Sequence, residues 1–499
     1  MRRVNTLCLS LVLTALAHGQ LQLPNTLSDH AVLQRDKPTN IFGWALPGEH
    51  ITVEIHHQIL KATADSLGQW NATMMPEPAG GPYSLTVTGD APNETPIKRN
   101  DILIGDVWIA SGQSNMAMPL RGFNARMPIK NSAAEIAAAK HPSIRLLHQA
   151  TRPSAVPLLD TDSVWTECTP QTAATFSAAG YLFAVKIAEM EKVPIGIIET
   201  AVGGTPVSSW TSLSAIAAHN FTYTALNAAN IAQDEALYNA TEQANDRLDA
   251  AAKTAGKPST KHLPLAATRN GAWTNSALFN GMVSPFLHTT IRGVIWYQGE
   301  TDTTSNRASN YRYSFPAMIQ DWRDQWGQGD FPFLFVQISS FHGTDDWAVV
   351  RDAQRRALAL RDTGMAVILD VGEPTNIHPA DKQTVAHRLA LAARHLSYGE
   401  AISAASPSFH TMTPEGSEAR VWFDHAEGLN THGQPLGGFE LAGDDGKFYP
   451  AMGSISIIGS PAQQTVLLHA KEVAVPKTVR YDWSATVTTF LYNAAGLPA

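Results

Sequence analysis

The stretch that decides the fold is Asp106–Met116, which reads DVWIASGQSNM. An apolar run, Asp106–Ala110, leads through Gly112 to Ser114. A short apolar run that ends at a glycine and a hydroxyl residue is typical of a buried strand followed by a tight turn into a helix. The glycine permits the turn, and the first N–H groups of the helix can stabilise a developing oxyanion. We therefore expect an α/β fold with a nucleophile at Ser114.

The middle of the chain repeats this alternation of short apolar runs with helical patterns. Helical spacing is clearest in Phe315–Trp326 and in Val385–Leu396, which Gly399 follows as a C-terminal cap. The further strand candidates are Ser143–Leu147, Pro194–Ile198, Gly293–Tyr297, Phe331–Ile338 and Met365–Asp370. Strands alternating with helices predict a central parallel sheet with helices on both faces.

Both ends of the chain are rich in β-type runs. Ile51–Ile55 and Tyr83–Val87 alternate near the N-terminus, and Thr465–Leu468, Val479–Tyr481 and Thr486–Thr488 are strand candidates near the C-terminus. Over 499 residues the patterns predict four segments. These are a signal peptide at 1–19, a β-sandwich-like module at 20–100, an α/β domain at 101–400 with an insertion at about 225–265, and a β-rich module at 401–499.

The N-terminus predicts export. Two arginines, an apolar run over residues 7–17 and small residues around Gly19 are typical of a secretory signal peptide. We expect a secreted or lysosomal, lumenal protein. Removal of the signal also removes Cys8, so that Cys168 has no intramolecular partner. No later run of about 20 apolar residues predicts a membrane span.

Sequons and net charge narrow the class further. Asn71, Asn93, Asn220 and Asn239 each begin an Asn-X-Ser/Thr triplet, so we expect a glycoprotein with these residues on its surface. The net charge is −8, without long single-sign blocks. This argues against a general nucleic-acid or anionic-membrane binder, because both need a basic surplus.

Chemistry in a parallel α/β sheet lies beyond the carboxyl ends of the strands. The candidates there are Ser114, the pair Gly203-Gly204, the pair Gln298 and Glu300, and His378. They supply a nucleophile, oxyanion donors, an orienting acid and a base, which acyl transfer requires. Pro379 suits a first helical position, so we expect His378 at a helix N-terminus that keeps its imidazole neutral.

Several motifs together resemble a known family. They are Asp106–Trp108, Gly112–Met116, Gly203–Pro206, Trp296–Glu300, Ile377–Pro379 and Asp381–Leu389. These stretches resemble the sialate O-acetylesterases of the SGNH hydrolase superfamily, which are related to carbohydrate acetyl esterases. The resemblance implies an enzyme that removes O-acetyl groups from sialic acids without a metal or cofactor. It implies Ser114 as nucleophile, His378 as base, and an oxyanion hole of the Ser114 N–H, a glycine of Gly203-Gly204, and Gln298.

The acid that orients His378 is open. Many SGNH enzymes have an aspartate two or three residues before the histidine, but Asn376 and Thr375 stand at these positions. We expect Glu300 first, and then Asp352, Asp370 or Glu373. A Ser–His dyad steadied by Asn376 or by a backbone carbonyl is the alternative.

Other functions and substrates stay open as well. A glycoside hydrolase could use Glu300 with a second carboxylate, and a non-catalytic sugar-binding protein would leave Ser114 without a role. Among esterases, an acetyl xylan or other polysaccharide acetylesterase is the alternative to a sialate esterase. A sialic acid carries a carboxylate, for which Arg121 and Arg351 are candidate partners. We expect an O-acetylated sugar as the partner, and the oligomeric state is unknown.

Overall fold

A mixed central sheet forms the middle of the molecule. The computed structural model describes residues 20–124, 127–219, 247, 254, 271–343, 346–459 and 463–499. The order is β13-β12-β11-β7-β10-β8-β9, and all neighbours are parallel except β8 and β9. The strands are β7 Ile97–Gly112, β8 His141–His148, β9 Thr166–Cys168, β10 Ile195–Ala201, β11 Gly293–Tyr297, β12 Phe333–Val336 and β13 Thr363–Ala366.

The predicted strands of the central region are confirmed, with one shift. β10, β11 and β12 are buried along their whole length, as expected of parallel strands covered on both faces. The prediction of a strand at Met365–Asp370 is wrong at its end. The strand β13 stops at Ala366, and Leu369–Val371 forms a 3-10 turn, because Val371 N–H donates to the Ile368 carbonyl instead of to a neighbouring strand.

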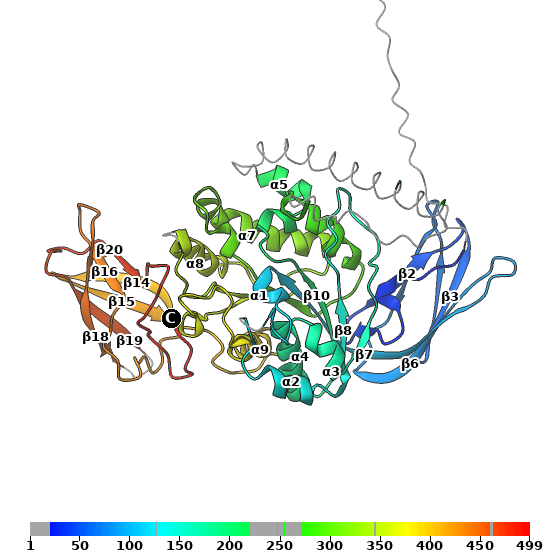
Figure 1. Cartoon of the computed structure of the whole chain (residues 1–499), viewed down its shortest axis with the longest axis horizontal. Coiled ribbons are helices and arrows are strands. Elements are labelled where there is room, and N and C mark those ends of the chain that lie inside the picture. The colour runs from blue at the N-terminus through cyan, green and yellow to red at the C-terminus, as the bar shows by residue number, and fades with distance from the viewer. Residues whose placement is uncertain are drawn as a thin grey trace, which may run out of the picture.

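Helices cover both faces of this sheet (Figure 1). The helix α7 (Ser305–Trp326) and the helix α8 (Asp346–Ala357) lie on one side, and α4 (Ala178–Glu191) and α9 (Lys382–Tyr398) pack together on the other. The apolar face predicted for α7 is buried, and Gly399 ends α9 with a φ of 69°. Shorter helices are α1 Ser114–Ala117, α2 Ser132–Ala138, α3 Pro170–Thr175 and α5 Leu213–His219, with 3-10 turns at Val207–Trp210 (η2) and Glu300–Thr303 (η7).

The N-terminal strands continue directly into the central sheet. The first half of β7 pairs with β6, and residues 103–105 of β7 pair with β1. The predicted boundary at residue 100 therefore lies inside one continuous strand. The strands here are β1 Val32–Gln34, β2 Thr39–Trp44, β3 His50–Ile55, β4 Gln58–Thr63, β5 Gln69–Met74 and β6 Gly80–Gly89.

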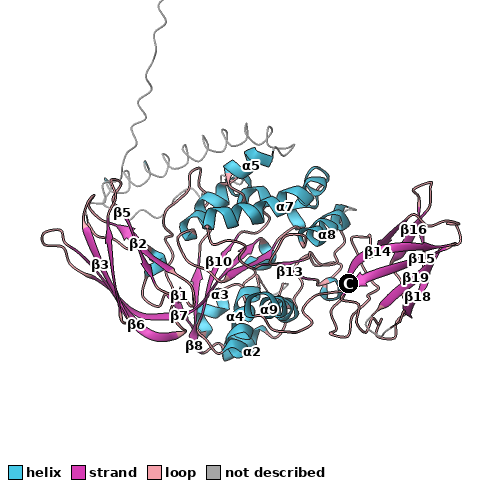
Figure 2. Ribbon diagram, turned by 180° about the vertical axis from the view of Figure 1, so that it is seen from behind, coloured by secondary structure: helices cyan, strands magenta, loops and turns pink. Residues whose placement is uncertain are grey.

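The C-terminal strands form two antiparallel sheets with their own core, and Figure 2 shows them as a group beyond β13. They are β14 Ser408–Glu415, β15 Glu418–Asp424, β16 Phe439–Ala442, β17 Phe448–Pro450, β18 Met452–Ile457, β19 Gln464–His469 and β20 Thr478–Tyr481. The strand predicted at Thr486–Thr488 is not formed. Val487 N–H donates to Ser340 Oγ instead, so this segment joins the C-terminal strands to the central region.

Some predictions fall outside the described residues: the signal peptide at 1–19, the sequons Asn220 and Asn239, and nearly all of the insertion at about 225–265. Asn71 and Asn93 are exposed, and Cys168 is a buried free thiol. Within the described ranges, no helix has the length and apolar character needed to cross a membrane.

Candidate active site

The turn after β7 places Ser114 at the carboxyl edge of the sheet. Gly112 ends β7 with a φ of 133°, and a Cβ there would collide with the carbonyl oxygen of Tyr297 on β11. Only glycine accepts both the backbone conformation and this close approach. The chain then enters α1, whose first residue is Ser114. The tight turn predicted from the sequence is confirmed.

His378 meets Ser114 across 264 positions of sequence. Its Nε2 lies 2.8 Å from Ser114 Oγ, and the ring of Phe123 lies edge-on against the imidazole with 5.4 Å between centroids. Both Ser114 and His378 are half-buried, so a substrate can reach them. This is the geometry of a nucleophile beside its general base.

The position predicted for His378 at a helix N-terminus is wrong. The helix α9 begins at Lys382, because the Asp381 side chain accepts the Thr384 N–H and caps the helix there. His378 lies in the preceding loop, which Asn376 braces: Asn376 Oδ1 accepts the His378 N–H, and Asn376 Nδ2 donates to the His378 carbonyl. Glu373 also accepts a bond from Asn376 Nδ2.

The imidazole of His378 is nevertheless biased toward its neutral form. Burial lowers the pKa of His378, and the positive charge of Lys382 lowers it further. A neutral imidazole can accept the Ser114 proton. The sequence therefore predicts the direction correctly, but the causes are desolvation and a neighbouring cation.

A buried chain of three polar side chains lies beside Ser114 and His378. Lys382 Nζ donates to Asn115 Oδ1 over 2.6 Å, and Asn115 Nδ2 donates to Glu300 Oε1 over 2.6 Å and to the Ile377 carbonyl over 3.0 Å. Asn115 and Ile377 are the neighbours of Ser114 and His378 in the sequence. Burial lowers the pKa of Lys382 to about 7 and raises that of Glu300. The sequence predicts no role for Asn115 or Lys382. Both lie within the quoted motifs, but a motif does not show which side chains its residues contact.

The predicted oxyanion donors divide into two groups. Gly203 lies against Ser114, since a Cβ on Gly203 would stand 3.3 Å from Ser114 Cβ, and Gly204 follows with a φ of 72°. The Gln298 side chain, by contrast, is fully buried and donates to the Thr205 carbonyl and to Asp302 Oδ2. Its Oε1 accepts from Tyr311.

The candidate acids bond to groups other than the imidazole. Asp352 pairs with Arg355 and Arg356 on α8, and Asp370 forms a bidentate pair with Arg388. Glu373 accepts the Ala380 N–H as well as Asn376. Across the described ranges, the side chain of His378 hydrogen-bonds to Ser114, and none of the four candidate carboxylates bonds to it.

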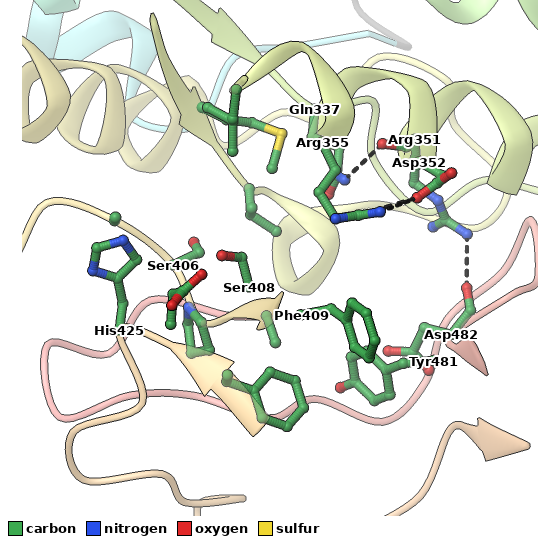
Figure 3. Close-up of a pocket in the computed structure, with 18 of the residues that line it drawn as sticks. Gln337, Arg351, Asp352, Arg355, Ser406, Ser408, Phe409, His425, Tyr481 and Asp482 are labelled. Carbon is green, nitrogen blue, oxygen red and sulfur yellow. Dashed lines mark hydrogen bonds and ion pairs between the residues drawn. The ribbon is translucent and has the colours of Figure 1, made fainter. Parts of the chain in front are cut away.

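The two candidate arginines lie in different places. Arg121 is exposed, two residues before Phe123. Arg351 is buried and lines a cavity of about 810 Å³ between α8 and the C-terminal strands. Figure 3 shows Arg351, Asp352 and Arg355 above this cavity, with Phe409, Tyr481 and Asp482 opposite them. Neither Ser114 nor His378 lines this cavity.

Comparison with known proteins gives consistent matches. The family model described as "Carbohydrate esterase, sialic acid-specific acetylesterase" matches residues 104–240 and 266–394. A sialate O-acetylesterase of Rattus norvegicus is 30% identical over 442 residues, which cover 79% of this chain and 77% of that protein. The human sialate O-acetylesterase is 30% identical over 421 residues, covering 75% and 70%. The crystal structure of a carbohydrate acetylesterase from Xanthomonas citri has a TM-score of 0.79 at 33% identity, covering 96% of this chain and 98% of that one.

Proposed function

The chain belongs to the sialic acid-specific acetylesterase family of carbohydrate esterases, and from this premise we propose that it removes O-acetyl groups from sialic acids through an acetyl-Ser114 intermediate. Membership makes the protein a carboxylic ester hydrolase. The observation that carries the proposed mechanism is the 2.8 Å approach of His378 Nε2 to Ser114 Oγ. We further propose that the central unit has the SGNH arrangement, with β-sandwich-like modules on either side.

The reaction proceeds in two steps. His378 Nε2 takes the proton of Ser114 Oγ as the oxygen attacks the acetyl carbonyl carbon, and the protonated imidazole then gives that proton to the leaving sugar oxygen. In the second step His378 takes a proton from water, whose oxygen attacks the acetyl-enzyme. Acetate leaves and Ser114 regains its proton. The lowered pKa of His378 supports its role as the base in both steps.

The negative charge on the carbonyl oxygen needs donors that are already in place. We assign this role to the backbone N–H groups of Ser114 and Gly203. The closeness of Gly203 to Ser114 Cβ supports the assignment. Gln298 has a supporting role, because its amide holds the Thr205 carbonyl and Asp302, and Asp302 in turn accepts the Val207 N–H of the loop that follows Gly203.

The base acts in a Ser–His dyad rather than in a triad with Glu300. The two bonds from Asn376 to the main chain of His378 support this assignment. Glu300 acts through Asn115, because its carboxylate accepts a hydrogen bond from Asn115 Nδ2. A glycoside hydrolase is not proposed, because Glu300 is only 6% exposed and a general acid must reach the glycosidic oxygen.

The test is a measurement of free acetate from matched substrates. We expect faster release from O-acetylated sialosides than from acetylated xylan. A polysaccharide acetylesterase is the second candidate, since the Xanthomonas citri protein of similar structure is described as a carbohydrate acetylesterase. A strong preference for xylan, with no release from sialosides, would overturn the sialate assignment but keep the mechanism.

We propose a secreted or lysosomal protein whose residues 1–19 are removed, with glycans at Asn71 and Asn93. The exposure of both asparagines supports this. Mass spectrometry of the protein from a eukaryotic host, before and after N-glycosidase treatment, tests it.

A further inference from the structure

Three metal-binding side chains meet at the tip of the β3–β4 hairpin. His56 and His57 form its two-residue loop, since Ile55 pairs with Gln58. His57 Nε2 lies 3.1 Å from Glu77 Oε1, and His56 Nδ1 lies 3.9 Å from Glu77 Oε2. One ligand atom from each of the three residues lies within 4.8 Å of those of the other two. Imidazole nitrogens and a carboxylate oxygen at this spacing can share one ion.

The loop residues are unusual for their backbone. Two-residue hairpin loops favour Asn-Gly or glycine, because they need a positive φ. Here His56 has a φ of 51°. Its ring stacks on Tyr83 with 4.3 Å between centroids, and the ring of His57 lies edge-on to it with 4.2 Å between centroids.

Glu77 is already oriented toward the two histidines. It is only 6% exposed, and Gln58 Nε2 donates to its Oε1 while Gln58 Oε1 accepts the Met75 N–H. Carboxylates that bind metals are typically oriented by a hydrogen bond from a neighbouring group, as the Gln58 amide orients Glu77 here. In the described ranges the ion-pair partners of Glu77 are His56 and His57, so no lysine or arginine neutralises its charge.

A second cluster of similar composition serves as a contrast. His30, Asp101 and Glu167 also place ligand atoms within 4.8 Å of one another. There, however, Arg145 Nη2 lies 2.8 Å from Asp101 Oδ2 and 3.9 Å from Glu167 Oε1. A permanent cation thus already sits where an ion would bind, and this cluster is not suited to a metal.

We propose that His56, His57 and Glu77 bind one Zn²⁺ ion. His56 Nδ1, His57 Nε2 and a Glu77 oxygen are three ligands of a tetrahedral site, and water takes the fourth position. The ion ties the hairpin loop to the segment between β5 and β6. The β3 strand lies at one end of the molecule and α1 in its middle (Figure 1), so the site stabilises the N-terminal strands and takes no part in hydrolysis.

The first test is calorimetric titration of the full chain, purified without a polyhistidine tag and stripped with EDTA, with ZnCl₂. We expect one equivalent to bind. His57→Gln removes a ligand and weakens binding by at least about 100-fold, more than the loss of an outer-shell partner costs. The control His30→Gln leaves the titration unchanged. Equal Zn²⁺ binding by the parent protein and His57→Gln overturns the proposal.

The second test does not depend on how well His57→Gln folds. His56→Gly removes a ligand but accepts the positive φ of the loop, so we expect it to fold. ZnCl₂ raises the unfolding temperature of the parent protein and leaves that of His56→Gly unchanged. Esterase activity is the same with and without ZnCl₂ in both. A parent protein whose unfolding temperature does not respond to ZnCl₂ contradicts the structural role.

Discussion

Two regions of this molecule hold buried charged side chains, and they differ in how these are paired. At the carboxyl edge of the sheet, Lys382 donates to Asn115, which donates to Glu300. At the cavity beside β13, Arg351 Nη2 donates to main-chain carbonyls, and Asp482 Oδ2 and Arg351 Nη1 have no hydrogen-bond partner among the described residues. The first network lies beside the proposed nucleophile Ser114 and the proposed base His378, and the second surrounds a cavity.

The comparison shows that a large cavity does not mark the candidate active site in this molecule. The cavity of about 810 Å³ has aromatic and charged walls that resemble a ligand site, yet Ser114 and His378 lie elsewhere. Convergence of a nucleophile, a base and backbone donors is the more specific criterion. Variants in the two regions should therefore have different effects on turnover and on stability.

The largest effect is expected for Ser114→Ala. Without the hydroxyl no acetyl-enzyme forms, and kcat/KM should fall by about 1000-fold or more, while the circular dichroism spectrum stays unchanged. Free acetate from an O-acetylated sialoside is the measurement. Ser111→Ala is the matched control, since Ser111 Oγ donates to the Thr200 carbonyl inside the sheet. Substantial turnover by Ser114→Ala would contradict the assignment.

Asn376→Ala should have the next largest effect. It removes both bonds that hold the main chain of His378, and a small misplacement of the base can cost about 100-fold. We expect the loss in kcat, with KM nearly unchanged, because Asn376 positions the base and does not bind substrate. Glu300→Gln is the comparison. A larger loss in Glu300→Gln than in Asn376→Ala would favour Glu300 as the orienting acid.

The sequence predicts which residues form the candidate site better than it predicts the hydrogen bonds between them. The strands that end before Ser114, Gly203 and Glu300 could be predicted, because a short continuous apolar run that ends near a glycine is typical of a buried strand. The start of α9 at Lys382 could not be predicted, because the sequence offers two possible helix starts. One has Pro379 in the first helical position, and the other has Asp381 as the N-cap, which the structure shows. Gln298 and Arg351 have the right residue type for their predicted roles. Their partners are set by long-range packing, which local spacing does not encode.

Lys382→Met tests the hydrogen-bonded chain of Lys382, Asn115 and Glu300. The base must be neutral, so activity is lost as pH falls through the pKa of His378. The Lys382 cation lowers that pKa. Its removal raises the pKa, and the acid limb of the kcat/KM profile moves to higher pH.

The same variant removes the bond from Lys382 to Asn115 and the positive charge that favours the ionised form of Glu300, so we expect the free energy of unfolding to fall. The double variant with Glu300→Gln should recover part of this stability in urea unfolding. An unmoved acid limb would show that Lys382 does not act on His378.

Arginine variants compare the two regions directly. If Arg121 recognises the sialic acid carboxylate, Arg121→Met should raise KM for acetylated sialosides by about 10-fold, the loss of one charge-assisted hydrogen bond pair. Arg351→Met should leave KM unchanged and lower only the unfolding temperature, because Arg351 joins α8 to the C-terminal strands. An increase of KM in Arg351→Met alone would move substrate binding to the cavity.

Asp482→Asn should have the smallest effect, on stability alone. Burial raises the pKa of Asp482 to about 7, above the ordinary value of about 3.9. Between these values the folded state binds more protons than the unfolded one, so the carboxyl destabilises the fold increasingly as pH rises, and fully above pH 7. Asparagine is uncharged and accepts the φ of 47° at this position.

We therefore expect the unfolding temperature of Asp482→Asn to exceed that of the parent at pH 8 by about 1 °C for each kcal/mol gained in a chain of 499 residues, and the two to be nearly equal at pH 4. Thermal unfolding at both pH values is the measurement, and esterase activity should not change. The expected gain depends on the charge of the buried Asp482 carboxylate, so a gain of equal size at both pH values would contradict it.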